Sequence, residues 1–223
     1  MELIFSVISY TPNLFKGLSL NLLISIVAMS IGTFLGYFLA KLRSARYVYL
    51  SQLGNTLNNI CRNVPSFVLI FYMAFLIPVE IITPIQWPLI GTVSFWTDTI
   101  EVYSISPWIK GSMALVIPVI GFSGDLFFNQ LFKNSHLNPN QEKIDISYLC
   151  VSWVNYLIII IMASATVSVI GIQEIVGVAN SIIATQADDA YFRLGLYIYV
   201  AFWFLCLGIL VNGCLFIIKK TAH

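Results

Sequence analysis

The stretch 148–180, YLCVSWVNYLIIIIMASATVSVIGIQEIVGVAN, most narrows what this chain can fold into. Its first half is almost purely hydrocarbon and, with its flanks, is long enough to cross a lipid bilayer as a helix. Its second half carries hydroxyl, amide and carboxylate side chains. Polar groups within a bilayer usually face a bundle interior or a water-filled cavity, so the stretch predicts a membrane helix with one polar side.

The polar residues of this stretch can be assigned to helix faces, because a helix advances about 100° per residue. Asn155, Thr166 and Gln173 fall within about 20° of one line, which we interpret as the border of a solute pathway or a subunit contact. The opposite side carries small residues that let a neighbouring helix approach closely: Ser164, Ser168 and Gly171. Helix packing with backbone hydrogen bonding by the hydroxyls is the alternative interpretation.

The composition indicates an integral membrane protein. Of the 223 residues, 59% are hydrophobic and 9% are charged, whereas soluble domains carry about 25% charged residues. No basic cluster is interleaved with surface aromatic residues, so nucleic acid is not an expected partner. No basic segment precedes the first apolar run, so no cleavable signal peptide is predicted.

Apolar runs along the chain predict an all-α fold of five transmembrane helices in one permease domain, at about 14–42, 57–77, 107–128, 149–175 and 191–218. Lys and Arg mark the cytoplasmic side of a membrane protein. With the N-terminus outside and the C-terminus cytoplasmic, eight such residues are inner and three are outer. The inner ones are Lys41, Arg43, Arg46, Arg62, Lys133, Lys143, Lys219 and Lys220, and the outer ones are Lys16, Lys110 and Arg193.

Several kinds of chemistry find no support in the sequence. His136 and His223 have no ligand spacing, so no metal site is predicted. The four cysteines lack CxxC spacing and are expected to be small packing or lipid-facing residues. No GxxxxGK[ST] loop is present, so we expect no ATP hydrolysis by this chain. Gly121-Phe122-Ser123-Gly124 is one residue too short for a nucleophile elbow, so no catalytic residue is predicted.

Three segments of the chain, at 14–46, at 62–71 with Pro78, and at 164–174, together resemble the membrane subunits of type I ABC importers for polar amino acids. The first, 14–46, has the family's opening helix with a basic, Ser-containing end. The second, RNVPSFVLIF at 62–71 followed by Pro78, is similar to the family's Arg-Gly-Thr-Pro motif. The third, SATVSVIGIQE at 164–174, resembles the family's TSL-xx-xIGxxEL segment, and the tail continues the match. The resemblance covers about three quarters of the chain.

Two departures from the family pattern concern the cytoplasmic loop and the second motif. Family members carry a loop with Glu-Ala-Ala that docks as a short helix on the ATPase subunit. Here the loop is shorter, and its possible remnant is Pro139, Gln141 and Glu142, without the alanines. In the second motif, Asn63 and Val64 replace the Gly and Thr.

The resemblance implies half of a translocation pathway for a polar amino acid or similar small polar solute. Asn155, Thr166 and Gln173 would face the centre, with Glu174 near the outer mouth. Arg62 and Pro65 would form the gate or inner mouth, with a snorkelling anchor as the alternative for Arg62. In a heterodimer, a second permease would carry most of the coupling to the ATPase, because a shortened loop without the Glu-Ala-Ala motif would transmit a rigid-body motion poorly.

The implied partners are ABC ATPase subunits that hold ATP and Mg, a second permease, an extracytoplasmic substrate-binding protein and the bilayer of a bacterial inner membrane. This chain would bind no cofactor itself. Two other functions stay open. A non-transporting structural or regulatory subunit of such a complex would explain the decayed loop equally well. A channel that works without nucleotide is the further alternative.

Overall fold

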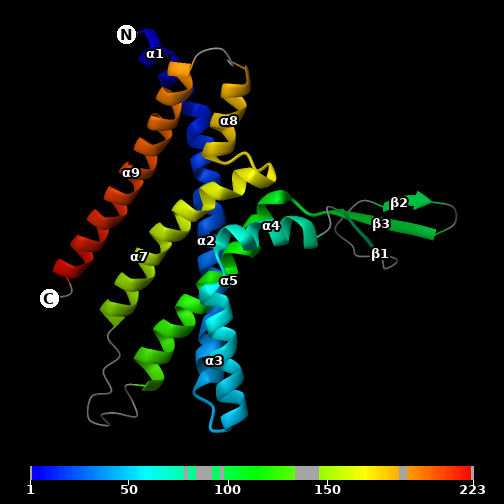
Figure 1. Ribbon diagram of the computed structural model, residues 1–223, viewed down its shortest axis with the longest axis vertical. Coiled ribbons are helices and arrows are strands. Elements are labelled where there is room, and N and C mark those ends of the chain that lie inside the picture. The colour runs from blue at the N-terminus through cyan, green and yellow to red at the C-terminus, as the bar shows by residue number, and fades with distance from the viewer. Residues whose placement is uncertain are drawn as a thin grey trace.

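The computed structural model describes residues 2–77, 80–83, 92–95, 98–133, 146–185 and 190–221. Helices dominate these residues, as the sequence predicted (Figure 1). The helical elements are α1 (Glu2–Ser9), α2 (Thr11–Arg43), α3 (Val48–Asn63), α4 (Ser66–Leu76), α5 (Pro107–Phe127), η1 (Phe128–Lys133), α7 (Ile146–Ser164), η2 (Ala165–Ile170), α8 (Ile175–Thr185) and α9 (Ala190–Thr221).

Four of these helices are long and apolar enough to cross a membrane, or five if the bent pair α3–α4 forms one span. The four are α2, α5 with η1, α7 with η2, and α9. Their length and composition identify a multi-pass membrane protein.

The 33-residue helix α2 runs through the helical part of the structure, and α1, α3, α5, α7 and α8 pack against it (Figure 1). Its closest neighbour is α5, and two glycines set the distance between them. A Cβ atom on Gly32 would lie 2.5 Å from the Val119 Cβ, and one on Gly36 would lie 2.5 Å from the Ser123 Cβ. Small residues let membrane helices approach backbone to backbone, so this contact depends on both positions being glycine.

The predicted single helix 57–77 is wrong, because the chain forms two helices that meet at 96°. Helix α3 begins earlier, at Val48, and ends at Asn63, and α4 begins after Pro65. Val64 is extended at φ −77° and ψ 124°. A proline disfavours the helical conformation for the residue before it and lacks an amide for the helical ladder, which explains the break.

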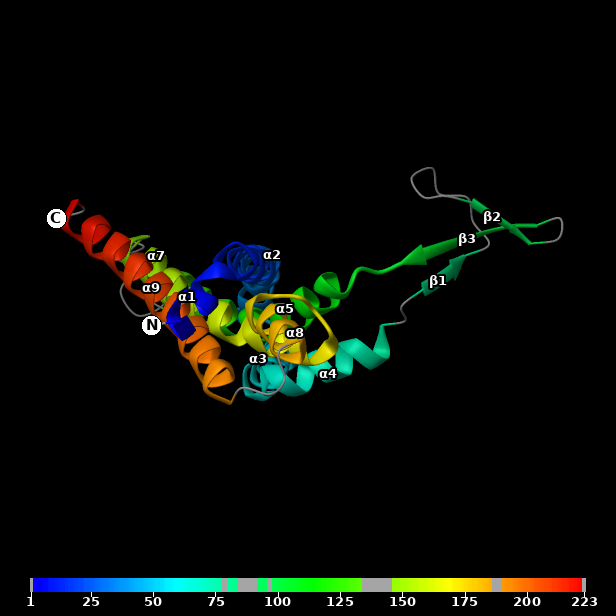
Figure 2. The same ribbon diagram turned by 90° about the horizontal axis from the view of Figure 1, so that it is seen from above.

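The all-α prediction also misses a small antiparallel sheet between α4 and α5. Its strands are β1 (Glu80–Thr83), β2 (Thr92–Phe95) and β3 (Asp98–Ser104), in the order β1-β3-β2. Figure 2 shows the sheet extending away from the helices. The strand sequences EIIT, TVSF and DTIEVYS are rich in β-branched and aromatic residues, which favour extended backbone.

The predicted helix 149–175 also ends early, at Ser164, and continues as the 3₁₀ helix η2. The hydroxyls of Ser164, Thr166 and Ser168 each donate to the backbone carbonyl three residues before, and such bonds compete with a regular helical ladder. Gly171 then adopts φ +82°, a left-handed conformation that glycine tolerates best. The chain turns there and restarts as α8.

Two apolar cores lie at different heights along α2. The first joins α2 to α4, α5, α7 and η2, with Ile24, Met29, Leu115 and Val119 among its fully buried members. The second joins the N-terminal part of α2 to α1, α8 and α9 through residues such as Leu14, Ile175 and Leu196. The α2 helix is therefore the element that both cores share.

The α2–α5 contact generates a stability prediction. We expect Gly36→Val to lower the stability of the detergent-purified protein by about 2 kcal/mol, because a buried contact would be overpacked. Thermal unfolding measures this change. Gly208→Val is the matched control, since a Cβ on Gly208 in α9 meets no heavy atom within 4 Å. Equal unfolding temperatures for the two variants would contradict the prediction.

Candidate functional site

An ion cluster centred on Asp125 lies where the C-terminal end of α2, the helix α3 and the last turn of α5 meet. One carboxylate oxygen, Oδ1, accepts from the Arg43 guanidinium at 2.7 Å and from the Asn58 amide at 2.9 Å. The other, Oδ2, accepts from the Arg62 guanidinium at 2.8 Å. One side chain of α5 thus ties together two helices that are consecutive in the chain.

Three glycines bring the backbones close enough for this cluster to form. A Cβ on Gly54 would lie 2.9 Å from the backbone nitrogen of Arg43, and one on Gly121 would lie 2.8 Å from that of Arg62. A Cβ on Gly124 would lie 2.5 Å from the Asn58 Oδ1. Within α3, Asn58 and Arg62 are four residues apart and share one side of the helix.

Arg43 makes two further contacts that extend the cluster. Its Nε donates to the Asn55 side-chain oxygen at 2.9 Å, and its guanidinium lies 4.3 Å from the centre of the Phe128 ring. Phe128 is the first residue of η1, which directly precedes residues 134–145 in the sequence. Arg43 therefore connects the end of α2 to the end of α5 and the start of η1 through charge and cation–π contacts.

The cluster carries a net positive charge, because two guanidinium groups face one carboxylate. The Arg43 side chain is 11% exposed, whereas the Arg62 side chain is 64% exposed. Arg43 therefore serves the interior packing, while Arg62 presents charge at the surface of the chain.

A second polar cluster lies around Asn21 in the N-terminal half of α2. The fully buried Asn21 amide donates to the Ser164 hydroxyl at 2.9 Å, and its side-chain oxygen accepts from the Ile175 backbone amide at 3.0 Å. Gly17, one turn earlier, packs against the same backbone, since a Cβ on Gly17 would lie 2.7 Å from the Ile175 Cα. This cluster fixes the break between α7 and α8 against α2.

Glu174 is fully buried and caps the N-terminus of α8. Its two carboxylate oxygens accept from the backbone amides of Val176 and Gly177, each at 3.0 Å. The first turn of a helix leaves amides without partners, and a carboxylate there also interacts favourably with the helix dipole. In this chain, Glu174 points into the bundle.

The residues predicted to share a polar line do not lie on one helix. Asn155 is exposed on α7, Thr166 is half-buried in η2, and Gln173 is exposed after the turn at Gly171. Gln173 accepts a hydrogen bond from the Ser181 hydroxyl at 2.8 Å. The η2 segment and the turn rotate Thr166 and Gln173 away from the positions that a continuous helix would give them.

Other predicted site residues fall in different places. Ser164 is fully buried against Asn21, whereas Ser168 is half-buried and Gly171 is exposed. Pro65 is exposed at the bend between α3 and α4. The predicted coupling residues Pro139, Gln141 and Glu142 lie outside the described residues.

Sequence reasoning missed Asn21, Asn58 and Asp125 as members of polar clusters. The signal for Asn21 was present, since an amide inside a membrane span is costly unless it has partners. Asp125 carried a similar signal as an acidic residue near the end of an apolar helix. Asn58 could not be singled out from the sequence, because α3 contains several other asparagine and glutamine residues.

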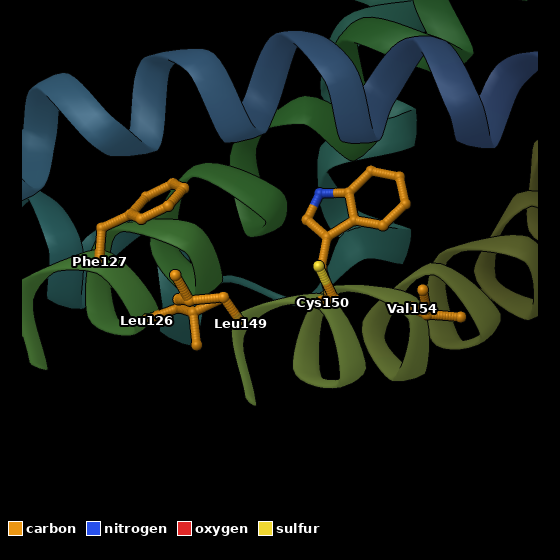
Figure 3. A pocket seen from close by; sticks show the side chains of 6 residues that line it. Leu126, Phe127, Leu149, Cys150 and Val154 are labelled. Atoms are coloured by element: carbon orange, nitrogen blue, oxygen red, sulfur yellow. The ribbon is translucent and has the colours of Figure 1, made fainter. Parts of the chain in front are cut away.

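An apolar cavity of about 230 Å³ opens between the end of α5 and the start of α7 (Figure 3). Its lining residues are Leu126, Phe127, Leu149, Cys150, Trp153 and Val154. Trp153 closes one side by donating from its indole nitrogen to the Thr33 hydroxyl of α2 at 2.8 Å. The cavity offers no charged group for a polar solute.

Comparison with known proteins places the fold. No protein-family model and no curated protein matches the sequence. Among solved structures, a chain described as the crystal structure of an amino acid ABC transporter with histidines matches with a TM-score of 0.73. The match covers 97% of each chain at 18% sequence identity. The two chains share one fold.

The ion cluster generates a prediction about coupling energies. In a double-mutant cycle, Asp125→Asn and Arg43→Gln should interact by about 2 kcal/mol, since this pair is mostly buried. Asp125→Asn and Arg62→Gln should interact by less than about 1 kcal/mol, because solvent screens the exposed guanidinium. Thermal unfolding in detergent measures both cycles. A larger coupling for Arg62 would contradict the assigned burial.

Glu174 can be tested as a helix cap rather than a solute contact. We expect Glu174→Ala to lower the free energy of unfolding by about 1–2 kcal/mol, because two amides lose their acceptors. Glu174→Gln keeps one acceptor oxygen and should lose less. Unfolding that is unchanged in Glu174→Ala would show that the carboxylate does not hold α8.

Proposed function

We propose that this chain is a membrane subunit of an ATP-driven importer and forms half of a translocation pathway. The observation that carries the proposal is the match in fold, over 97% of both chains, to a protein described as an amino acid ABC transporter. The three sequence segments that resemble polar amino acid importers support the same function. The solute would be a polar amino acid or a similar small polar molecule.

The proposed arrangement has five spans, with α3 and α4 together forming the second. The N-terminus is outside and the C-terminus is cytoplasmic, in a bacterial inner membrane. This orientation puts Lys41, Arg43 and Arg46 on the inner side, in agreement with the charge bias of membrane proteins. The Asp125 ion cluster then lies toward the inner end and Glu174 toward the outer end.

Power would come from separate ATPase subunits that bind ATP and Mg. The segment 134–145 is the proposed contact with them, through Pro139, Gln141 and Glu142. The contacts of Arg43 with Asp125 and Phe128 support this role, because they join the end of α2 to the start of η1, which precedes that segment. A second permease with a complete coupling loop would carry most of the motion, and an external binding protein would deliver the solute.

Within the pathway we assign Asn155, Thr166 and Gln173 to the wall, and Arg62 with Pro65 to the inner mouth. Asn155 and Gln173 are exposed in the single chain. The Gln173 side-chain oxygen accepts from the Ser181 hydroxyl, so the Gln173 NH2 group and the Asn155 amide are the groups that could meet a solute or the second permease. Such amides satisfy the carboxylate and ammonium of an amino acid better than apolar side chains do.

The pathway assignment predicts the effect of removing polar groups. Thr166→Val with Gln173→Leu should reduce uptake in proteoliposomes that contain the whole complex, while the complex still assembles. Asn212→Leu is the control, because the Asn212 amide donates only to the Gly208 carbonyl of its own helix, α9, in the described part of the chain. Uptake that is equally affected in both variants would remove these residues from the pathway.

The partner assignment is tested by purifying the tagged chain from its native membrane. The importer proposal expects an ABC ATPase and a second permease in stoichiometric amounts. A chain that purifies with neither would contradict it. A non-transporting regulatory subunit is the second candidate, and it predicts that solute-stimulated ATPase activity of the remaining complex persists without this chain.

A further inference from the structure

Helix α3 presents three different faces along its length. Gly54 and Asn58 form the buried face toward α2 and α5. A second face carries the amides Gln52, Asn55, Asn59 and Asn63, which are all exposed and which we call the amide row. A third carries apolar side chains that are 40–54% exposed, namely Leu50, Leu53, Leu57 and Ile60.

The spacing of the two exposed faces follows the helix period. The amide row recurs at intervals of three, four and four residues, and the apolar row at intervals of three, four and three. Residues at such spacing share one side of a helix. The amides are therefore collected into a stripe rather than scattered around α3.

The two rows require different surroundings. Exposed leucine and isoleucine suit lipid, whereas an amide facing hydrocarbon loses hydrogen bonds at a cost of several kcal/mol. The side chains of Gln52, Asn59 and Asn63 make no hydrogen bond to another residue that the structure describes. Their partners must come from water or from a polar molecule beside α3.

The amide row is bordered by positive charge. Arg62, also on α3, is 64% exposed and uses one nitrogen for Asp125. The sequence of α3 contains no Asp or Glu, and the Asp125 carboxylate is already shared between two guanidinium groups. A wall of this kind attracts carboxylates and repels cations that have no negative group.

We propose that the amide row of α3 lines the inner half of the solute route, and that Arg62 receives the carboxylate of the departing solute. This inference rests on the proposed importer function and deepens it. The transported solute is then a neutral or acidic amino acid, or another small molecule with a carboxylate, rather than a net cation. The apolar row faces lipid.

The first test measures water access to each row in the purified complex. Single cysteines replace Gln52 or Asn59 on the amide row, and Leu53 or Leu57 on the apolar row, in a chain whose four native cysteines are changed to Ser. Thiols react as thiolates, which apolar surroundings disfavour. A membrane-impermeant methanethiosulfonate should therefore label the amide row at least about tenfold faster than the apolar row.

The second test measures the charge beside the row. At Asn59→Cys, an anionic methanethiosulfonate should react faster than a cationic one, relative to a free thiol in solution. Adding Arg62→Gln should reduce this preference by about three- to tenfold, because the two positions are one helical turn apart. The same substitution beside Leu53→Cys should change the preference less. No change at Asn59→Cys would overturn the role of Arg62.

Two outcomes overturn the wall itself. Equal labelling rates of the amide row and the apolar row would show that the amide row does not line the solute route. Labelling of the amide row in the isolated chain but not in the complex would show that another protein covers it. If the cysteine-free chain does not assemble, Asn59→Leu and Asn59→Gln are compared in the native chain. Uptake of a neutral amino acid should fall severalfold in the first variant and persist in the second; equal uptake would contradict the wall.

These outcomes separate the wall from the importer proposal. ATP-dependent uptake without a difference in labelling between the two rows would contradict the proposed role of the amide row and leave the importer proposal intact. A clear labelling contrast in a complex that shows no ATP-dependent uptake of any amino acid would remove the importer proposal, and with it the exit role of the amide row.

Discussion

The fold depends on the close contact between α2 and α5, at Gly32 and Gly36. Lipid tails are as apolar as leucine, so two membrane helices gain little from hiding apolar side chains against one another. Their association depends on packing, and packing is best where backbones can touch. The described helices α3, α4, α7 and α8 all contact this pair directly or through η2. A change in the distance between α2 and α5 would therefore be felt throughout the bundle.

Two polar clusters, one at the C-terminal end of α2 and one in its N-terminal half, fix how far the neighbouring helices are shifted along α2, which close packing alone does not determine. Asp125 fixes the C-terminal end of α2 against α3 and α5, and Asn21 fixes its N-terminal half against α7 and α8. The two clusters pair the Asp125 carboxylate, the Arg43 guanidinium and the Asn21 amide, which would be costly if unpaired in a membrane, whereas the buried Asn58 Oδ1 has no hydrogen-bond partner among the described residues. The importer role that we propose would need such fixed points, because a force applied to the segment 134–145 would have to reach the rest of the chain.

Part of this architecture could be predicted from the sequence. The helical, membrane-spanning character followed from apolar runs, and the order of motifs pointed to the fold that the solved structure shares. The bend at Pro65 was also readable, because a proline after Val64 disfavours a continuous helix, but hydropathy alone suggested one span. The early end of α7 was not predicted, because it depends on three hydroxyls and Gly171 acting together. Assigning residues to faces assumes a continuous helix and therefore misses such a break.

The polar sites were harder to predict, because they join residues far apart in the chain. Asn21 meets Ser164, and Asn58 meets Asp125. No sequence motif marks these side chains, and they form clusters only because glycines bring the helices close together. The capping role of Glu174 was also not predicted, since its carboxylate is buried and accepts from the first amides of α8, while its predicted place near an outer mouth stays a prediction.

We propose that this chain forms one wall of a solute route and takes its driving force from companion proteins. The most direct measurement places the purified chain alone in lipid vesicles and follows a labelled amino acid across the membrane, before and after the ATPase and second permease are supplied with Mg-ATP. We expect no flux with the chain alone and accumulation against the gradient with the full complex. Flux through the single chain without nucleotide would contradict it.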